Sequence, residues 1–236
     1  TMKTIFEGAD SLILEALSLG AGKSLKQKST CAALIASPDF ASRMDSLVSA
    51  LFSQIEHNWV DRNPSLMNWK LRRQTEINPI NKSPEILLER AITILAERGL
   101  LPEWYNQLPI ASGLLDEKSD KRAAVDLVRL KGNCAELIEL KWESDTPAYA
   151  AFEILRYGLV FLFCRKMQER FQYHDYPLMK LERISLRVLA PCEYYGTSDL
   201  GFLQDAMSVA VQRLFKEQGA LLGDFLFLSF PPHFRL

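Results

Sequence analysis

The chain of 236 residues has few of the side chains that build zinc sites or disulfide frameworks. It contains four cysteines and three histidines, and neither a Cys-x-x-Cys pair nor a His-Glu-x-x-His motif occurs. These absences exclude a zinc hydrolase of that kind and a small secreted scaffold held by disulfides. Cysteines that are far apart in the sequence are typical of a protein in the reducing cytoplasm, which is where we expect this one. They are Cys31, Cys134, Cys164 and Cys192.

A strong net charge and a long apolar run are also missing. Lysine and arginine number 28 and aspartate and glutamate 29, so the net charge is −1 and the sequence pI is about 6.3. This balance provides no overall basic signature of nucleic-acid binding, although a cleft needs only a local basic patch. No apolar run approaches the length of a membrane helix, and Glu7 and Asp10 interrupt the start of the chain. We expect a soluble protein without a membrane partner, with a sizeable core because 48% of its residues are hydrophobic.

Several catalytic and nucleotide-binding motifs are absent as well. There is no Gly-x-Ser-x-Gly elbow and no Gly-x-Gly-x-x-Gly after a strand, which excludes the usual serine hydrolases and dinucleotide enzymes. Gly22-Lys23-Ser24 is similar to the end of a phosphate-binding loop, but the first glycine of that motif would fall at Leu17 and no strand precedes it. We therefore predict no organic cofactor site.

The most informative stretch that is present runs from residue 123 to residue 142. Two segments rich in Val, Leu and Ile flank Gly132-Asn133, a pair that suits a tight hairpin turn, so we predict two antiparallel strands. With these two residues in the turn, Lys131 faces Cys134, and Asp126 faces Glu139 further along. Their Cβ atoms would be about 5 Å apart. A turn one residue longer or shorter would break this pairing.

Two carboxylates that face each other repel unless a cation lies between them, and a divalent metal would resolve the conflict. Side chains alternate along a strand, so Lys141 lies on the same face as Glu139 and diagonal to Asp126. The alternative interpretation is an exposed strand face with a cross-strand ion pair. Apolar neighbours on both faces of the hairpin favour burial instead. They are Val125, Leu127, Leu137, Ile138 and Leu140.

At these residues the chain resembles the PD-(D/E)XK nuclease superfamily, whose signature is an acid on one strand and Glu-x-Lys on the next. The resemblance implies that Asp126, Glu139 and the main-chain carbonyl of Leu140 bind Mg²⁺, with Mn²⁺ as a substitute, and that Lys141 acts on the attacking water or on the phosphate. Oxygen ligands suit this hard ion, and a bound metal activates water and neutralises phosphate charge. A second Glu-x-Lys, at residues 116–118, lies in a polar run that we interpret as a solvated loop.

A helix over residues 84–98 begins with Ser83-Pro84-Glu85, a cap, a first-position proline and an early acid. In the nuclease superfamily the helix before the strands often carries a further acid near the metal. Glu89 is our candidate, acting through water. Glu85 is the second choice, because the helix dipole already explains an acid in the first turn.

A later helix, over residues 148–167, contains Glu153 and Tyr157, four positions apart and therefore on one helix face. They resemble the Gln-x-x-x-Tyr element of the RecB-like branch, with Glu153 in the place of Gln. A surface glutamate and a packed tyrosine explain the pair equally well. The proline that precedes the first acid in the superfamily is replaced here by Val125.

The order of predicted elements from residue 83 onward is helix, three strands, helix, strand, helix, strand, which is the order of the restriction-endonuclease-like core. We therefore predict an α/β fold with this nuclease-like domain over residues 83–236. The further elements lie at residues 104–112 (strand), 181–190 (strand), 201–218 (helix) and 225–230 (strand).

Residues 1–82 are predicted to form a helical N-terminal region and a polar linker. Asp10 can cap a helix that ends before Gly20, and Asp39 a longer one whose apolar stripe we interpret as a core face. That stripe is Phe40, Met44, Leu47, Val48, Leu51, Phe52 and Ile55.

Basic residues in two regions are compatible either with a local phosphate-binding surface or with scattered solvated charges. The first group lies in the linker, and for it we prefer the interpretation as a solvated face. It consists of Lys70, Arg72 and Arg73. The second group is Arg165, Lys166, Arg170, Lys180, Arg183 and Arg187.

The function that these features favour is Mg²⁺-dependent hydrolysis of DNA phosphodiester bonds, with DNA as the partner. The alternative is a catalytically inactive nuclease-fold module for DNA binding or assembly, and RNA is a third possibility for the substrate. A homodimer or a partner subunit is compatible with the sequence. Endonuclease and exonuclease action, sequence preference and pathway stay open, because fold analogy does not supply them.

Overall fold

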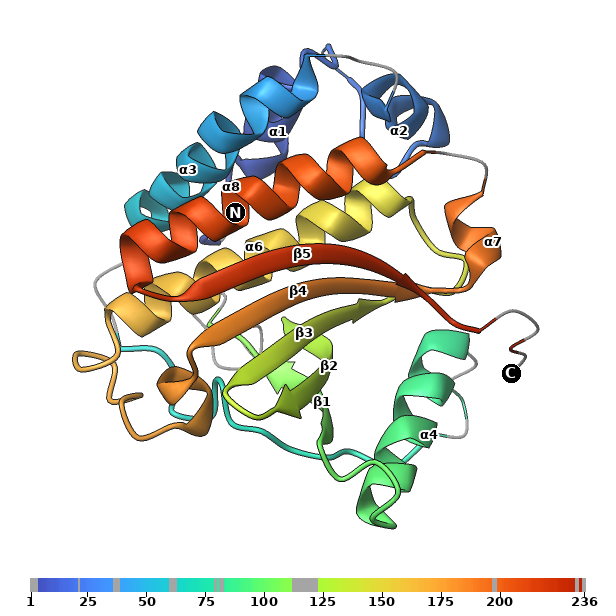
Figure 1. Cartoon of the computed structure of the whole chain (residues 1–236), viewed down its shortest axis with the longest axis vertical. Helices are drawn as coiled ribbons and strands as arrows, with labels where there is room; N and C mark the ends of the chain where they lie inside the picture. Colours follow the sequence, from blue (N-terminus) through green and yellow to red (C-terminus); the bar gives the residue numbers. More distant parts are fainter. Residues whose placement is uncertain are drawn as a thin grey trace.

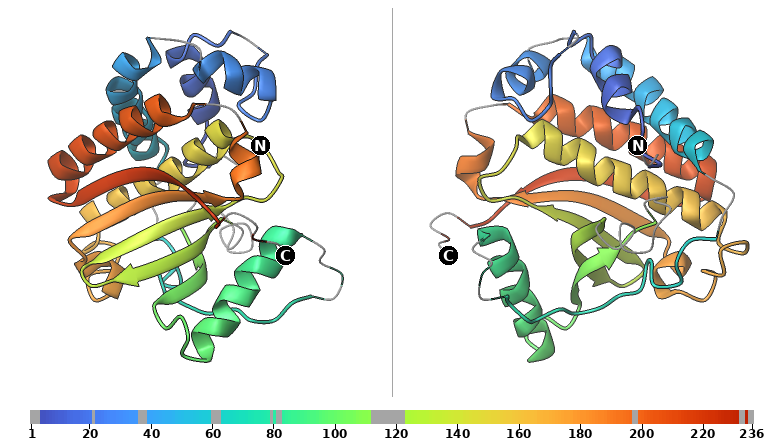
Figure 2. Two further views of the ribbon diagram at one scale, coloured as in Figure 1. Left: turned by 45° about the vertical axis from the view of Figure 1, so that its right-hand side comes forward. Right: turned by 180° about the vertical axis from the view of Figure 1, so that it is seen from behind.

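The computed structural model describes residues 4–20, 22–35, 39–59, 63–78, 80, 83–111, 123–196, 199–231 and 234. It has an α/β fold, as predicted, built around one five-stranded mixed sheet (Figure 1). Two long helices cover one face of the sheet, N-terminal helices form a further layer outside them, and one helix lies on the opposite side (Figure 2). The predicted loop at residues 116–122, with its second Glu-x-Lys, lies outside the described residues.

The sheet has the strand order β1-β2-β3-β4-β5. The first three strands form an antiparallel meander, and β3, β4 and β5 are parallel. Parallel neighbours need crossover connections, which α6 and α8 provide. The strands are β1 (Trp104–Pro109), β2 (Ala124–Lys131), β3 (Cys134–Leu140), β4 (Arg183–Ala190) and β5 (Leu222–Ser229), and the helices are α6 (Pro147–Lys166) and α8 (Gly201–Gly219).

The predicted order of elements after residue 83 is present, beginning with α4 (Pro84–Glu97). Strand β5 begins at Leu222 rather than at residue 225, and β1 ends at Pro109 rather than at residue 112. Leu222 and Gly223 pair with Arg183 and Ile184 of β4. Parallel pairing therefore extends the strand through a glycine that local preference alone would exclude.

Helix α6 is the centre of the core, and most of its residues are buried. Gly158 lets it approach the sheet, because a Cβ atom there would lie 2.7 Å from both Cδ atoms of Leu186 on β4. Within the described part of the chain, α6 alone is long and apolar enough to cross a membrane, and 72% of its apolar window is buried inside the protein. The expectation that no apolar run reaches this length does not hold for α6 by length and composition, because a mostly buried core helix can be as apolar as a membrane span.

The N-terminal helices are α1 (Ala9–Ala16), α2 (Lys28–Ile35) and α3 (Phe40–Asn58). The predicted stripe of seven apolar residues on α3 is confirmed, since all seven are buried, and α3 packs against α8 and α6. Asp10 does not cap α1. It lies in the first turn, where its carboxylate accepts a hydrogen bond from Arg156 at 3.0 Å, and Gly8 with φ +81° precedes the helix.

The polar segment before α4 runs along β1. Arg72 Nε donates to the Gln107 carbonyl at 2.6 Å and Arg73 Nε donates to the Trp104 carbonyl at 3.0 Å. The main-chain N–H of Trp69 donates to the Pro109 carbonyl at 2.8 Å. The interpretation as a solvated or phosphate-binding face was therefore wrong for Arg72 and Arg73, because these side chains satisfy carbonyls of the edge strand, whereas Lys70 is exposed as a solvated face requires.

The remaining elements are a 3-10 helix, η1 (Pro177–Lys180), and a one-turn helix, α7 (Cys192–Tyr195), after β4. Opposite α6 and α8, helix α4 packs through Leu88 against Leu127 of β2 and Ile138 and Leu140 of β3. The ends of β2 and β3 that carry the candidate residues are thereby covered from both sides.

Candidate functional site

The β2–β3 hairpin has the predicted register. Its pairs run from Lys131 with Cys134 to Leu127 with Ile138, and Gly132 in the turn has φ +60°. Asp126 and Glu139 lie one step beyond the last of these pairs. At this step Asp126 Oδ2 accepts a hydrogen bond from the main-chain N–H of Leu140 at 2.9 Å. A side chain thus replaces a main-chain partner at the end of the ladder and ties the Asp126 carboxylate to β3.

Glu139 and Lys141 are buried, with 5% and 7% of their surface exposed. An exposed strand face is therefore ruled out. The Lys141 ammonium lies 2.9 Å from Glu139 Oε1 and 2.9 Å from Glu153 Oε2 of α6. The structure brings together three predicted residues and the glutamate of the RecB-like element. We call Asp126, Glu139, Lys141 and Glu153 the acidic cluster.

Helix α6 is held at its beginning by a cap. Thr146 Oγ1 accepts a hydrogen bond from the main-chain N–H of Tyr149 at 3.2 Å, and Pro147 occupies the first turn, where no N–H is needed. About two turns of helix after this cap, Glu153 reaches the ammonium of Lys141. Tyr157 lies one turn further, and burial together with the charges of Glu139 and Glu153 raises the pKa of its hydroxyl.

The acidic cluster holds three carboxylates and one ammonium. Burial raises the pKa of Asp126 to about 6, with the charges of Glu153 and Glu85 adding to the rise and the Leu140 N–H and Lys141 opposing it. Burial, Asp126 and Glu153 together hold the pKa of Glu139 well above its usual range. The pKa of Lys141 is raised, because the attraction of Glu139 and Glu153 outweighs its burial. Negative charge is in excess, and a further cation would relieve it.

The donor set fits Mg²⁺ or Mn²⁺ by its chemistry. Asp126 and Glu139 offer carboxylate oxygens, and the main-chain carbonyl of Leu140 lies between Glu139 and Lys141 in the sequence. Within the described ranges no group of three or more His, Cys, Asp or Glu side chains is arranged to hold a metal. The donors considered for Mg²⁺ are the carboxylates of Asp126 and Glu139 and the main-chain carbonyl of Leu140. Protein sites for Mg²⁺ usually supply one or two carboxylates.

Glu89 of α4 is buried, and three side chains donate hydrogen bonds to its carboxylate: Arg90, Asn106 at 2.7 Å and Gln107 at 3.0 Å. Burial raises its pKa to about 7, Arg90 lowers it, and the charge of Asp126 raises it. Glu89 is thus close enough to interact with Asp126, while its oxygens anchor α4 to β1. Its role as a water-mediated metal ligand stays a prediction.

Glu85, the second choice on α4, has a structural task. Its Oε1 accepts hydrogen bonds from the main-chain N–H of Trp142 at 3.0 Å and from Ser144 Oγ at 2.6 Å. Both partners lie in the loop that follows Lys141. Glu85 therefore fixes the direction in which the chain leaves the acidic cluster.

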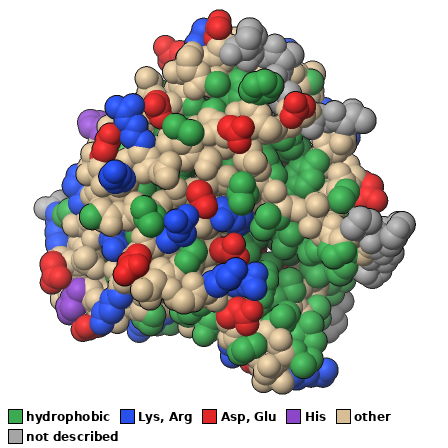
Figure 3. Space-filling view, in the orientation of Figure 1, with side chains coloured by type: hydrophobic (Ala, Val, Ile, Leu, Met, Phe, Trp, Pro, Cys, Tyr) green, Lys and Arg blue, Asp and Glu red, His purple; other side chains and the backbone are tan. Residues whose placement is uncertain are grey.

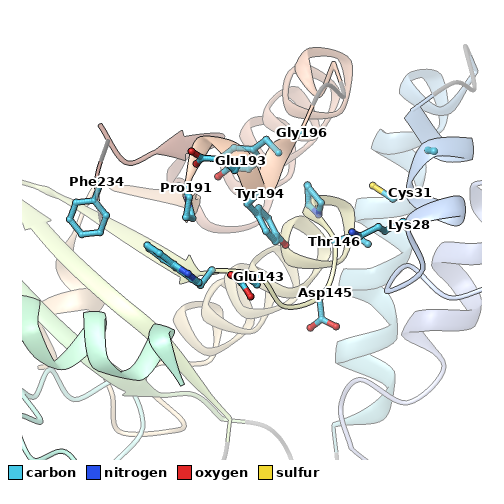
Figure 4. Close-up of a pocket in the computed structure, with 14 residues that line it drawn as sticks. Lys28, Cys31, Glu143, Asp145, Thr146, Pro191, Glu193, Tyr194, Gly196 and Phe234 are labelled. Atoms are coloured by element: carbon cyan, nitrogen blue, oxygen red, sulfur yellow. The ribbon is translucent and has the colours of Figure 1, made fainter. Parts of the chain in front are cut away.

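A cavity of about 830 Å³ opens beside this loop (Figure 4). Its lining comes from the loop, from the first turn of α6, from α2 and from α7. The sequence does not predict this cavity, because α2 and α7 are short and bear no periodic pattern. The only signal was the aromatic pair Tyr194-Tyr195 directly after the end of β4.

The second group of basic residues does not form a local positive surface. Arg187 is buried and bridges to Asp224 at 2.8 Å, Arg183 lies 3.5 Å from the same carboxylate, and Lys166 lies 2.9 Å from Glu56. Lys180 pairs with Asp175, Arg165 donates to the Leu181 carbonyl, and Arg170 lies over the ring of Phe171. The left part of Figure 3 accordingly shows acidic and basic side chains interspersed. The interpretation as scattered solvated charges fits Lys166, Lys180 and Arg183, whose side chains are 41%, 61% and 43% exposed. It was wrong for Arg187, which is buried and paired with Asp224.

No family model, curated protein or solved structure matches this chain.

Proposed function

We propose that this protein is a Mg²⁺-dependent nuclease with a restriction-endonuclease-like core that hydrolyses phosphodiester bonds in DNA. One observation carries the proposal: Asp126, Glu139 and Lys141 lie at one end of the hairpin, with Glu139 and Lys141 buried, Asp126 partly buried, and more carboxylates than cations. The order of elements, helix, three strands, helix, strand, helix, strand, supports it.

In this proposal Asp126, Glu139 and the Leu140 carbonyl hold Mg²⁺, or Mn²⁺ in its place. A bound ion of this kind supplies positive charge to the phosphate and lowers the pKa of water. Lys141 donates hydrogen bonds to the attacking water or to a phosphate oxygen. Glu139 and Glu153 keep its ammonium charged and in place, since both carboxylates contact Nζ.

The excess of buried carboxylates favours an enzyme over a catalytically inactive module. Burying like charges together is costly unless a cation completes the group. A module that only bound DNA would depend on basic side chains that contact phosphates, and Arg72, Arg73, Arg183 and Arg187 are engaged within the protein.

The test is cleavage of labelled linear DNA, supercoiled DNA and RNA by the wild-type protein with Mg²⁺, Mn²⁺ or a chelator. We expect metal-dependent cutting of DNA that Asp126→Ala and Lys141→Ala each reduce by a factor of about 10² to 10⁴. Lys166→Ala is the matched control, because Lys166, at the end of α6, is also a lysine in an ion pair with a glutamate but contacts Glu56 instead of the acidic cluster.

The outcomes separate the alternatives. Equal cutting by the wild type and by Lys141→Ala would contradict the assigned site. Binding of DNA without cutting in any metal would support the inactive module instead. Preferential cutting of RNA would keep the chemistry and change the substrate.

A further inference from the structure

The cavity beside the acidic cluster lies next to the proposed catalytic lysine. Trp142, which lines the cavity, directly follows Lys141, so their Cα atoms are about 3.8 Å apart. The hydrogen bond from the Trp142 N–H to Glu85 at 3.0 Å fixes the position of this residue against α4. A group held against Trp142 would therefore lie beside the chain segment that carries Lys141.

Aromatic and proline side chains make the walls. Trp142, Tyr194 and Phe234 line the cavity together with Pro147 and Pro191. The rings of Trp142 and Phe234 pack against each other with centroids 6.2 Å apart. Figure 4 shows Tyr194 between Pro191 and Thr146, and Phe234 at the opposite end from Lys28 and Cys31. At about 830 Å³ the space falls within the range of about 300 to 1,000 Å³ that is usual for small-molecule sites.

The hydroxyl of Tyr194 points to a link between the cavity and the acidic cluster. It is buried and has no hydrogen-bond partner within the described part of the chain. Burial raises its pKa, and Lys141 is the first charge that opposes this rise, which places the hydroxyl within electrostatic reach of the ammonium. A ligand in the cavity would therefore contact a ring whose buried hydroxyl has no hydrogen-bond partner within the described residues.

Charge in the lining is negative by a small margin. Glu143, Asp145 and Glu193 contribute three carboxylates and Lys28 one ammonium, and Lys26 forms an ion pair with Asp145 at 3.2 Å. An anion would be repelled here, whereas a neutral heterocycle with amino groups would stack on the rings and donate hydrogen bonds to the carboxylates. Nucleobases other than thymine and uracil have such an exocyclic amino group.

We propose that this cavity receives an unstacked nucleobase of the nucleotide next to the bond that is cut, so that the substrate is single-stranded or has a single-stranded end. This inference rests on the proposed nuclease function. Bases in a duplex cover each other's faces and cannot stack on Trp142 and Tyr194 without being extruded, which costs a few kcal/mol. The preference for unpaired DNA would follow from this cost.

The test is the binding of single-stranded oligonucleotides that contain 2-aminopurine, a fluorescent adenine analogue with an amino group, to the wild-type protein in the presence of a chelator. Stacking on aromatic rings quenches this fluorophore. We expect binding with quenching, and a loss of affinity of about 10-fold in Trp142→Ala and in Tyr194→Ala, since one base–aromatic stack is worth about 1 to 3 kcal/mol. Phe202→Ala is the control, because Phe202 is an exposed aromatic residue on α8 that does not line the cavity.

Two variants keep the test independent of folding. Tyr194 lies on the one-turn helix α7, whereas Trp142 packs against apolar residues of α4, β2 and β3, so the two substitutions disturb different parts of the structure. Circular dichroism reports the fold of each variant. Unchanged quenching and affinity in both folded variants would overturn the inference. So would duplex binding and cutting as strong as those of a single strand.

The inference and the proposed function fail in different ways. Metal-dependent cutting without any quenching of 2-aminopurine would contradict nucleobase binding in the cavity but would support the proposed nuclease function. Quenching that depends on Trp142 and Tyr194, without cutting in any metal, would support the pocket and refute the nuclease.

Discussion

Two groups of charged residues lie at the same sheet and differ in their balance of charge. The acidic cluster at the end of β3 has three carboxylates around Lys141. The second group, which we call the balanced cluster, joins Arg187 of β4 to Asp224 at 2.8 Å and to Glu136 at 3.5 Å, with Arg183 3.5 Å from Asp224.

The pKa shifts in the two clusters have opposite directions. In the balanced cluster burial opposes ionisation of Asp224, but hydrogen bonds from Arg187 and Ser185 outweigh it and lower the pKa. In the acidic cluster burial and neighbouring carboxylates raise the pKa of Asp126 and Glu139. The balanced cluster pairs two acids with two arginines, whereas in the proposed function a further cation completes the acidic cluster. Perturbed pKa values of this second kind are typical of functional sites.

The largest expected effect concerns activity. Glu139→Gln removes the charge of a proposed metal ligand and keeps the size of the side chain. We expect the rate of DNA cutting to fall at least about 10³-fold, because the charge of the metal stabilises the transition state by several kcal/mol. Asp224→Asn, the matched change in the balanced cluster, should keep cutting near the wild-type rate. Initial rates on labelled DNA measure both, and equal losses in the two variants would remove the distinction between the clusters.

A smaller loss is expected for Glu153→Gln. This change removes one of the two carboxylates that hold the Lys141 ammonium, and a displaced catalytic group costs about 10- to 100-fold in rate. Because Glu153 is not a proposed metal ligand, the affinity for Mg²⁺ should stay near that of the wild type. A parallel loss of metal affinity would make Glu153 a ligand instead of a positioning residue.

The free energy of unfolding should change in the reverse order: Asp224→Asn should lower it more than Glu139→Gln does. Asp224→Asn leaves Arg187, which is 6% exposed, without its closest acid, and we expect a loss of about 1 to 2 kcal/mol in the free energy of unfolding, since Asp224 itself is partly exposed. Glu139→Gln removes one of several mutually repelling carboxylates and should not destabilise the metal-free protein. Urea unfolding in a chelator compares the two. Greater destabilisation by Glu139→Gln would contradict the excess of negative charge.

The stability of the metal-free protein should depend on pH in opposite ways through Asp126 in the acidic cluster and Asp224 in the balanced cluster. The pKa of Asp126 is raised to about 6, so the folded state binds its proton more tightly, and this contribution to stability is present at low pH and is lost as the pH rises from about 4 to about 6. The lowered pKa of Asp224 has the reverse effect: its contribution is present above about pH 4 and is lost as the pH falls through the pKa of the folded state. Thermal unfolding from pH 3 to pH 7 should therefore show that Asp126→Asn and Asp224→Asn change the slope in opposite senses. Slopes of one sign would contradict the assigned directions.

Local patterns were sufficient to predict the hairpin and the main helices. Gly132 determined the register of β2 and β3 and hence the proximity of Asp126 and Glu139, and the stripe on α3 indicated its buried face. These predictions succeeded because turn geometry and helical periodicity depend on residues close together in the chain.

Features that depend on distant parts of the chain could not be predicted. The sequence does not distinguish Arg187, neutralised by Asp224, from Lys141, held by Glu153, since both partners lie on other elements. Arg72 and Arg73 were misinterpreted for the same reason, and the cavity requires α2, α7 and the loop after β3 to meet. Such contacts are set by tertiary packing.

The most direct test of the central claim is isothermal titration of Mg²⁺ into the wild-type protein, Asp126→Ala and Asp224→Asn. If the acidic cluster is the metal site, the wild type and Asp224→Asn bind Mg²⁺ alike and Asp126→Ala does not bind it. Unchanged Mg²⁺ affinity in Asp126→Ala would show that the ion binds elsewhere and that the assigned site is wrong.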